Sequence, residues 1–340
     1  MDDLDRLEAS RGKFLAAAGI TGAALAAGAW KTKTAGAALP TRAYVASHFA
    51  LELDGASAGF LRSVDGGGIV GEVVSEPGSA TYYQKKHIGN VKYGEFTLRL
   101  GLSMSKSVYD WISASLAGTY QRKSGAVVAA DFNYKEKARR EFHDALITEV
   151  GFPALDASSK EPAYLELTFA PDLTERKAGS GATLQAPATQ KQKQWLPSNF
   201  RFEVAGMPTG RVSKVDAFTI KQTTVTDDIG EARISTKEPG KLEIPNLTIT
   251  FAEVDAGPWE AWHDDFVIKG NNDESKEKTG AIVFLSPNRQ DELARVVLHG
   301  VGIVSVEPEQ GDAAADAIRR IKAELYCERM EFTYGGKALE

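Results

Sequence analysis

The pattern of apolar and polar side chains along the chain is mainly that of β-strands. Every second residue of segment 96–102 is Phe or Leu, and segment 165–169 repeats this alternation. A period of two places one set of side chains on each face of a sheet, so these segments are predicted strands. Residues 107–116 are predicted to be helical, because their apolar side chains recur at helical spacing. Pro258 stands at the start of the matching segment in the second half, and a proline is well tolerated in the first turn of a helix.

The second half of the chain repeats the first at a nearly constant spacing. Residues 49–65 and 200–216 share six identities at an offset of 151. The offset then drifts by a few residues, and at the end Leu167 and Phe169 are expected to match Met330 and Phe332. Solenoid units are typically about 20–50 residues long. A duplicated whole domain is therefore the better interpretation, and we predict that the two blocks have the same fold.

The two blocks are flanked and separated by segments of different composition. Residues 173–198 are rich in Ala, Gly, Gln, Lys, Thr and Pro without a hydrophobic period, which indicates a linker. Residues 1–40 begin with a charged stretch, continue with an apolar run at 16–30 and end in small residues, which is typical of a cleavable export signal. The run of 15 residues is shorter than the ~20 needed to span a bilayer.

The start of that run carries a partial export motif. Ser10-Arg11-Gly12-Lys13-Phe14-Leu15 resembles a twin-arginine signal, with Gly12 in the place of the second arginine. Two hypotheses therefore stay open for residues 1–40. They form a cleavable export signal, or they form a disordered Ala/Gly arm that docks on a neighbouring subunit.

Composition narrows the class of protein. The net charge of −6 and the pI of about 5.6 argue against sequence-independent nucleic-acid binding, which needs a basic surface. Cys327 is the one cysteine in the sequence, so the chain can form neither an intrachain disulfide nor a thiolate metal cluster. We expect Cys327 to be a small buried hydrophobic residue.

Candidate chemical motifs do not meet their structural requirements. Gly66-x-Gly68-x-x-Gly71 formally fits a dinucleotide fingerprint, but that motif needs a strand followed by a helix, and both flanks are predicted strands. The five histidines are scattered without metal-ligand spacing, and His263-Asp264-Asp265 is interpreted as a solvated helix end. We therefore assign no catalytic, cofactor-binding or metal-ligating residue and expect no cofactor. Trp111 and Trp262 are expected to be core residues, with interface anchors as the alternative.

Residues 48–172 carry a series of short motifs whose order and spacing are informative. They are residues 49–53 with Gly55, Val64-Asp65-Gly66, residues 91–101, Tyr109-Asp110-Trp111, residues 122–128, residues 138–142, residues 153–162 and the strand at 163–169. In this order they resemble the tail tube protein family, which builds the inner tubes of contractile phage tails and of phage-tail-like injection systems. The second block resembles the family mostly through the first. It keeps Lys278-Thr279-Gly280 but lacks a clean equivalent of residues 155–162.

The resemblance implies the fold class. It predicts a mainly β protein with two tandem antiparallel β-sandwich or half-barrel domains, each with one flanking helix. The first tail-tube-like domain spans 45–172, the linker 173–198 and the second domain 199–335. The sheets are expected to join around a ring into one lumen wall. Residues 133–150, helical by propensity, form a strand pair in the family, and propensity is a weak guide against tertiary context.

The resemblance also implies the function. It predicts a non-enzymatic structural subunit that self-assembles into rings and a hollow tube of a contractile injection apparatus, located in a virion or an exported extracellular particle. Two alternatives stay open: a baseplate hub or tube-capping adaptor, and an exported extracellular tube or filament protein. The expected partners are the chain itself and sheath, baseplate or cap proteins, without specific nucleic-acid recognition and without a stable membrane span.

The duplication allows two further expectations. Two domains per chain predict a ring of three chains with six domain positions, whereas the alternative is six chains per ring with the second domain decorating the tube. Residues 66–89 lie between two strong strands and are polar and glycine-rich, so they are expected to be a long excursion that contacts the neighbouring ring.

Overall fold

The structure, a computed structural model, describes residues 46–76, 84–185, 195–228, 234–309 and 318–335. The two hypotheses for residues 1–40 concern a segment outside these described residues, so they stay predictions.

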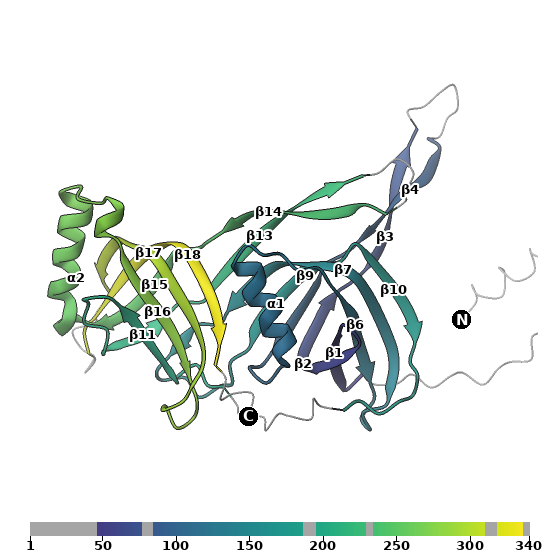
Figure 1. Ribbon diagram of the computed structural model, residues 1–340, viewed down its shortest axis with the longest axis horizontal. Coiled ribbons are helices and arrows are strands. Elements are labelled where there is room, and N and C mark those ends of the chain that lie inside the picture. The colour runs from purple at the N-terminus through teal and green to yellow at the C-terminus, as the bar shows by residue number, and fades with distance from the viewer. Residues whose placement is uncertain (1–45, 77–83, 186–194, 229–233, 310–317, 336–340) are drawn as a thin grey trace, which may run out of the picture. The chain divides into compact units, whose positions relative to one another are not determined.

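The first domain is a closed antiparallel barrel. Its six strands follow the order β7-β6-β1-β2-β5-β9, and β9 pairs with β7 to close the cycle (Figure 1). Closure gives every barrel strand two neighbouring strands in the barrel. The barrel strands are β1 (His48–Leu53), β2 (Ala56–Gly66), β5 (Phe96–Leu100), β6 (Lys123–Ala130), β7 (Glu136–Phe152) and β9 (Leu165–Ala170).

Five further elements belong to this domain. β3 (Ile69–Ser75) and β4 (Lys86–Tyr93) form a hairpin, and both flanks of the Gly66–Gly71 motif are strands, as predicted. The helix α1 (Lys106–Leu116) agrees with the predicted helix and inserts the fully buried Trp111 into the core. The two remaining elements are the short strand β8 (Leu155–Asp156) and the strand β10 (Leu173–Ala178).

The second domain has the same strands, but its sheet stays open. The order is β11-β16-β17-β18-β15-β12, which matches the barrel of the first domain except that β11 and β12 do not pair. α2 follows β15, as α1 follows β5, and Pro258 lies in its first turn, as predicted. The elements are β11 (Phe200–Val204), β12 (Val212–Val215), β13 (Phe218–Asp227), β14 (Thr236–Glu243), β15 (Leu247–Ala252), η1 (Glu253–Asp255), α2 (Ala256–His263), the π-helix η2 (Asp264–Ile268), η3 (Glu274–Lys276), β16 (Lys278–Leu285), β17 (Glu292–Pro308) and β18 (Arg320–Tyr334).

Strand registers show how closely the two domains correspond. An offset of 151 relates β1–β5 to β11–β15, and an offset of 156 relates β7, β9 and β10 to β17 and β18. Even the irregularities recur, since the register shift after Ile147 in the first domain recurs after Ile303 in the second. One register slip would turn every side chain of a strand to the other face, so matched registers mean matched cores. Corresponding pairs are Leu51↔Val127 with Phe202↔Ile282, Phe142↔Gly125 with Leu298↔Gly280, Ile147↔Phe169 with Ile303↔Leu325, and Val74↔His87 with Val225↔Glu238.

Two details differ from the sequence-based expectation. Leu167 and Phe169 correspond to Ala323 and Leu325, not to Met330 and Phe332. The reason is that β18 is one long strand that takes the place of β9 and β10 together. β10 lies at the start of the segment expected to be a linker and pairs with β7, so the first domain continues to Ala178.

The segment expected to be a strand pair, 133–150, also differs. It is a turn followed by β7, a single strand of 17 residues. Asp144 interrupts it with a φ of 51°, a left-handed value that shifts the strand from one pair of neighbours to the next. Strand formers are scarce here, but pairing on both edges of β7 overrides the helical propensity.

Candidate assembly interface

The two domains are connected by one continuous antiparallel strand pairing, which we call the joint. It consists of residues 149–157 of the first domain and residues 213–221 of the second. β7 pairs with β13 and β8 pairs with β12 in a single register, so the sheet of one domain runs into that of the other. The pairs are Glu149↔Lys221, Val150↔Ile220, Gly151↔Thr219, Phe152↔Phe218, Leu155↔Val215 and Asp156↔Lys214, followed by the hydrogen bond from Ala157 N–H to Ser213 O at 2.9 Å.

Aromatic rings fill the centre of the joint. Phe152, 2% exposed, stacks on Phe218 with 4.8 Å between ring centroids. It also lies 6.1 Å from Phe284 and 6.0 Å from Phe332, both in the second domain. Trp195 packs edge-on against Phe284 at 4.9 Å. Buried aromatic pairs of this geometry stabilise beyond the area that they bury, so these residues contribute much of the domain contact.

A polar cluster flanks the aromatic centre where the β13–β14 hairpin meets the first domain. Arg122 donates to the Asp172 carboxylate at 3.1 Å and to Glu238 Oε1 at 2.9 Å. The Lys237 backbone N–H donates to Asp172 Oδ1 at 2.9 Å, and its ammonium donates to Tyr93 O at 3.3 Å. Burial lowers the pKa of Lys237 and raises the pKa of Asp172, although each has an opposite charge nearby.

The helix α1 adds a third contact between the domains. Tyr109 of α1 stacks on Tyr334 of β18 at 3.7 Å between ring centroids, with 8° between the planes. Ser113 Oγ donates to Phe332 O at 2.6 Å, and Tyr334 Oη donates to Leu102 O at 2.8 Å. Burial raises the pKa of Tyr109 well above its usual range, which keeps the phenol neutral. The joint is therefore supported on two sides.

Comparison with known proteins places the first domain in a family. Residues 45–172 match the family model described as T4-like virus tail tube protein gp19. Over this range the first domain matches the tail tube family. This confirms the resemblance found in the sequence motifs, and the matched range covers the closed barrel with α1 and the β3–β4 hairpin. No curated protein matches the chain in sequence.

Several solved structures are similar to parts of the chain. The anti-feeding prophage cap (AFP tube terminating cap) is 16% identical over 46% of this chain and 98% of that chain, with a TM-score of 0.34. A chain of the PVC sheath-tube complex, an extracellular contractile injection system in the extended state, is 20% identical over 40% and 89%, with a TM-score of 0.32. Hcp1 from Flavobacterium johnsoniae is 14% identical over 40% and 95%, with a TM-score of 0.23.

An ion-pair triad recurs at equivalent places of the tail tube domain and the second domain. Arg139 donates to Glu136 at 2.8 Å and to Glu52 at 3.0 Å, linking β7 to β1 across β6. In the second domain Arg295 donates to Glu292 at 2.9 Å and to Glu203 at 3.3 Å. The triad thus marks the outer wall of both domains at the same register.

Each triad lowers the pKa of one of its carboxylates. Burial raises the pKa of Glu136, whose side chain is 3% exposed, but hydrogen bonds from Arg139 and Ser180 outweigh burial, and the net pKa lies below its usual range. The hydrogen bond from Arg295 lowers the pKa of Glu292. Both carboxylates therefore stay charged and paired at neutral pH.

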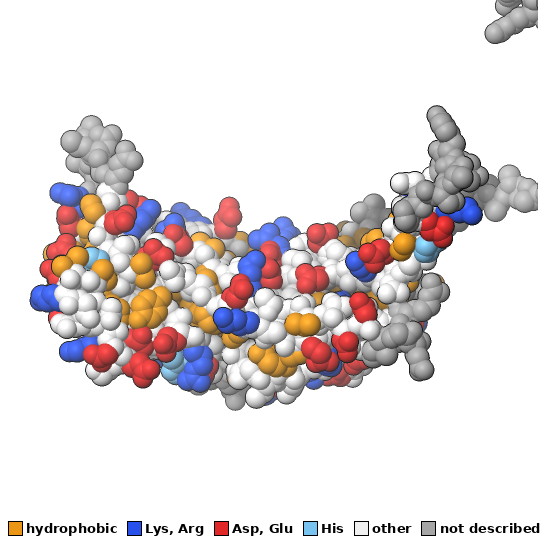
Figure 2. Space-filling model, turned by 90° about the horizontal axis from the view of Figure 1, so that it is seen from above, with side chains coloured by type: hydrophobic (Ala, Val, Ile, Leu, Met, Phe, Trp, Pro, Cys, Tyr) orange, Lys and Arg blue, Asp and Glu red, His pale blue; other side chains and the backbone are white. Residues whose placement is uncertain are grey.

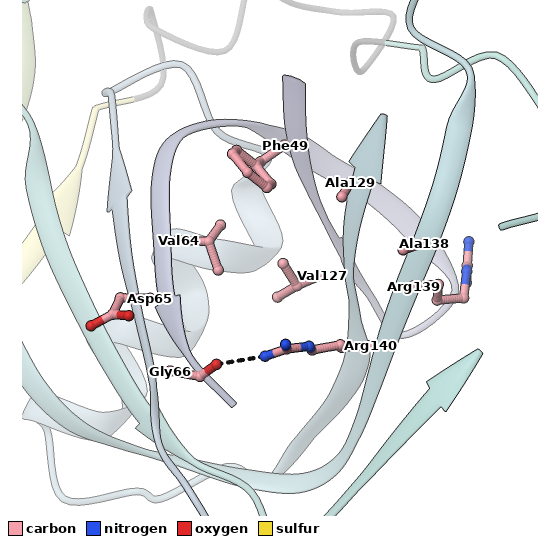
Figure 3. Close-up of a pocket in the computed structure, with 9 residues that line it drawn as sticks. All are labelled: Phe49, Val64, Asp65, Gly66, Val127, Ala129, Ala138, Arg139 and Arg140. Atoms are coloured by element: carbon pink, nitrogen blue, oxygen red, sulfur yellow. Dashed lines mark hydrogen bonds between the residues drawn. The ribbon is translucent and has the colours of Figure 1, made fainter. Parts of the chain in front are cut away.

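A cavity of about 360 Å³ opens at one end of the tail tube barrel. Phe49, Val64 and Val127 point into it, and Arg140 reaches across it to donate to Gly66 O at 2.7 Å (Figure 3). Asp65 and Arg139 point away from its centre. The lining combines apolar side chains with Asp65, Arg139 and Arg140, and the Arg140 guanidinium is already bound to the backbone.

The corresponding region of the second domain is filled. The position of Ala129 in the cavity wall is taken there by Phe284, which is fully buried. Phe152 and Trp195 pack against this ring, and Leu155 pairs beside Val215, the counterpart of Val64. The joint therefore occupies in the second domain the place that the first domain leaves open.

Other candidate chemistry resolves into structural contacts. Within the described part of the chain, Glu141, His143 and Glu175 have ligand atoms within 4.8 Å of one another and could hold a metal, but Glu141 is bound by the Lys177 ammonium in an ion pair. Burial raises the pKa of the Cys327 thiol to about 12, as expected for a buried hydrophobic residue. Among the described residues, no helix is both long and apolar enough to cross a membrane. On the face shown in Figure 2, acidic and basic side chains are interspersed.

The sequence placed some of these residues correctly and missed others. Trp111 is a core residue, as expected, and its indole N–H donates to Gln121 O at 2.8 Å. Trp262 is only partly buried, whereas its neighbour Trp259 is fully buried in the core. The joint residues Phe152 and Phe218 gave no signal, since an aromatic residue at a strand end is ordinary in any β-domain. The triads could have been found, because both copies carry a Glu and an Arg three residues apart.

Proposed function

We propose that the chain is a structural, non-enzymatic subunit that self-assembles into rings and a hollow tube of a phage-tail-like injection apparatus. The observation that carries the proposal is the combination of a tail tube family domain with a second domain of the same strand registers. The two are held head to tail by the joint. A non-isologous contact of this kind generates a ring when its rotation closes.

We expect three chains per ring, with six domain positions. Each chain supplies one domain contact internally, through residues 149–157 and 213–221. Covalent connection makes that contact intramolecular, so it forms before any contact between chains. In the alternative arrangement, six chains form the ring and the second domain decorates the tube. The backbone groups on the free strand edges of both domains would then need other hydrogen-bond partners.

The proposal also defines the partners and the location. The required partner is the chain itself, and sheath, baseplate or cap proteins of the same apparatus are further partners of a tube subunit. The particle would be a virion or an exported extracellular assembly, with residues 1–40 as signal or arm. A hub or cap adaptor differs from a tube subunit in one respect: it stops at a single ring.

Electron microscopy of the purified protein tests the proposal, with native mass spectrometry of the rings. We expect stacked rings of three chains, each of 36.6 kDa when its N-terminal segment is retained. Single rings that never stack would support the adaptor instead. Rings of six chains would overturn the stoichiometry, and a protein that stays monomeric at high concentration would overturn the structural role.

A further inference from the structure

Each of the two segments that pair in the joint has an equivalent segment in the other domain. Among the described residues, these two equivalents are paired on one strand edge only. The offsets of 151 and 156 convert residues 219–221 of the second domain into residues 68–70, and residues 149–151 of the first domain into residues 305–307. Among the described residues, residues 305–307 pair with β18 on one edge, and β16 leaves the other edge at Val301. Within the residues that the structure describes, β3 pairs with β4 on one edge and has no strand on its other edge.

We propose that residues 68–70 of one copy pair antiparallel with residues 305–307 of a second copy, in the register of the joint. This inference rests on the proposed function and names the surface by which chains meet. Ile69 would then face Val306, as Ile220 faces Val150 within the chain, and Val70 would face Ser305, as Lys221 faces Glu149. The occupant is a second copy because the matching surface lies on this chain.

Burial supports the assignment. In the joint, Ile220 is 1% exposed, whereas its counterpart Ile69 is only partly buried on the unpartnered β3–β4 hairpin, and the adjacent Val70 is 60% exposed. Val73 and Ile88 of the same hairpin are also more than half exposed. An exposed strand with apolar side chains and free backbone groups is a template for pairing with another chain.

The cavity in the tail tube barrel points to the same surface. It opens beside residues 63–66 of β2, which pair with β5 on one edge and, in the described chain, have no strand on the other. At the equivalent place of the second domain, β8 of the first domain pairs with β12. The edge of β2 at residues 63–66 is thus unpaired in the first domain, whereas a strand of the neighbouring domain pairs with the equivalent edge in the second domain.

This lateral contact differs from the ring-to-ring contact expected from the sequence for residues 66–89. The hairpin of the second domain, β13–β14, lies against the neighbouring domain through its first residues, 218–221. If β3 pairs in the way that β13 does, its contact is with the neighbouring domain of the same ring. The sequence could not distinguish these two cases, because both need an exposed hairpin.

Paired cysteines test the inference in a Cys327→Ala background. Two single-cysteine chains, Val70→Cys and Ser305→Cys, are co-expressed, oxidised and separated on a non-reducing gel. Facing residues of an antiparallel pair have Cα atoms about 4.5–5.5 Å apart, within the range of a disulfide. We expect covalent dimers from the mixture and none from either chain alone.

The controls separate this inference from the proposed function. Glu149→Cys with Lys221→Cys in one chain is the matched internal control, because their side chains meet at 2.9 Å across the joint. If this disulfide forms and the mixture gives no dimer, the inference is overturned. Dimers from either single-cysteine chain alone would also overturn it, because the contact would then be isologous. Rings seen by microscopy without mixed dimers would leave the proposed function standing, and the absence of both would remove both.

Discussion

Phe152 is the residue whose removal should disturb the joint most. Its ring is 2% exposed and lies 4.8 Å from Phe218 and 6.1 Å from Phe284 between centroids. Truncation of a buried phenylalanine to alanine costs about 3–5 kcal/mol, from lost transfer free energy and the cavity left behind. We therefore expect Phe152→Ala to lower the free energy of unfolding by about 3–5 kcal/mol.

The assay is urea unfolding followed by far-ultraviolet circular dichroism, with Phe132→Ala as the control. Phe132 is 79% exposed, so its truncation should change the free energy of unfolding by less than about 0.5 kcal/mol. A loss below about 1 kcal/mol for Phe152→Ala would refute the burial on which the reasoning depends.

A double-mutant cycle with Phe218→Ala then tests whether the ring acts across the domains. Residues in contact have interaction energies of about 0.5–3 kcal/mol, and stacked aromatic pairs about 0.5–1.5 kcal/mol. We expect the double variant to lose less stability than the two single losses added together. Strict additivity would mean that the two rings do not touch, and the joint would have to be abandoned.

Three further predictions concern the tail tube barrel, the triads and the cysteine. Gly67→Ala should lower the free energy of unfolding by more than about 1 kcal/mol, because its φ is +64° and a Cβ would lie 2.2 Å from the Phe96 ring; Gly68→Ala, with open space at its Cβ, is the control, and equal urea midpoints would contradict this. Glu136→Gln should be less stable than the parent at pH 7, because a carboxylate whose pKa is lowered on folding stabilises the folded protein above its unfolded pKa near 4.3. This stabilisation is lost as the pH falls through the lowered pKa, so the two proteins should be equally stable below it. A difference in urea unfolding that persists at the acidic pH would contradict this. Cys327 should resist a maleimide at pH 8 in the folded protein and react in denaturant, because burial raises its pKa to about 12; fast native labelling, seen as a mass increase, would show an accessible thiolate.

Alternation and repetition in the sequence predict much of this fold. Leu98 and Leu100 alternate with polar residues, and both are fully buried on β5. The offset of 151 holds as far as β15, four extra residues then accumulate in the segment that includes η2 and η3, and β16 follows an offset of 155. One more residue is added before β17, so β17 and β18 follow an offset of 156. The sequence detected the drift but could not assign the end of the repeat, because β18 runs through the position where the first domain turns between β9 and β10.

Elements held by backbone pairing were harder to predict than those held by side chains. β10 has four exposed residues in its six, so its sequence looks like a linker. Its stability comes from hydrogen bonds along β7, which no hydrophobic period records. The joint escaped prediction for a related reason, since its register is set by the meeting of two distant segments and neither segment alone differs from an ordinary strand end.

The contact within the chain and the proposed contact between copies differ in strength, and this difference would affect assembly. Within the chain, Phe152 faces Phe218, and both are nearly fully buried. At the equivalent positions between copies stand Pro308 and Gly67, which supply little apolar area, and proline has no backbone N–H to donate. Burial of a large apolar side chain stabilises by about 1.5–3 kcal/mol, so the contact within the chain is the stronger of the two. A ring built from alternating strong and weak contacts assembles from preformed two-domain chains and comes apart at the weak ones. The symmetry of the proposed ring would then be three-fold, with six-fold character limited to the strand registers that the two domains share.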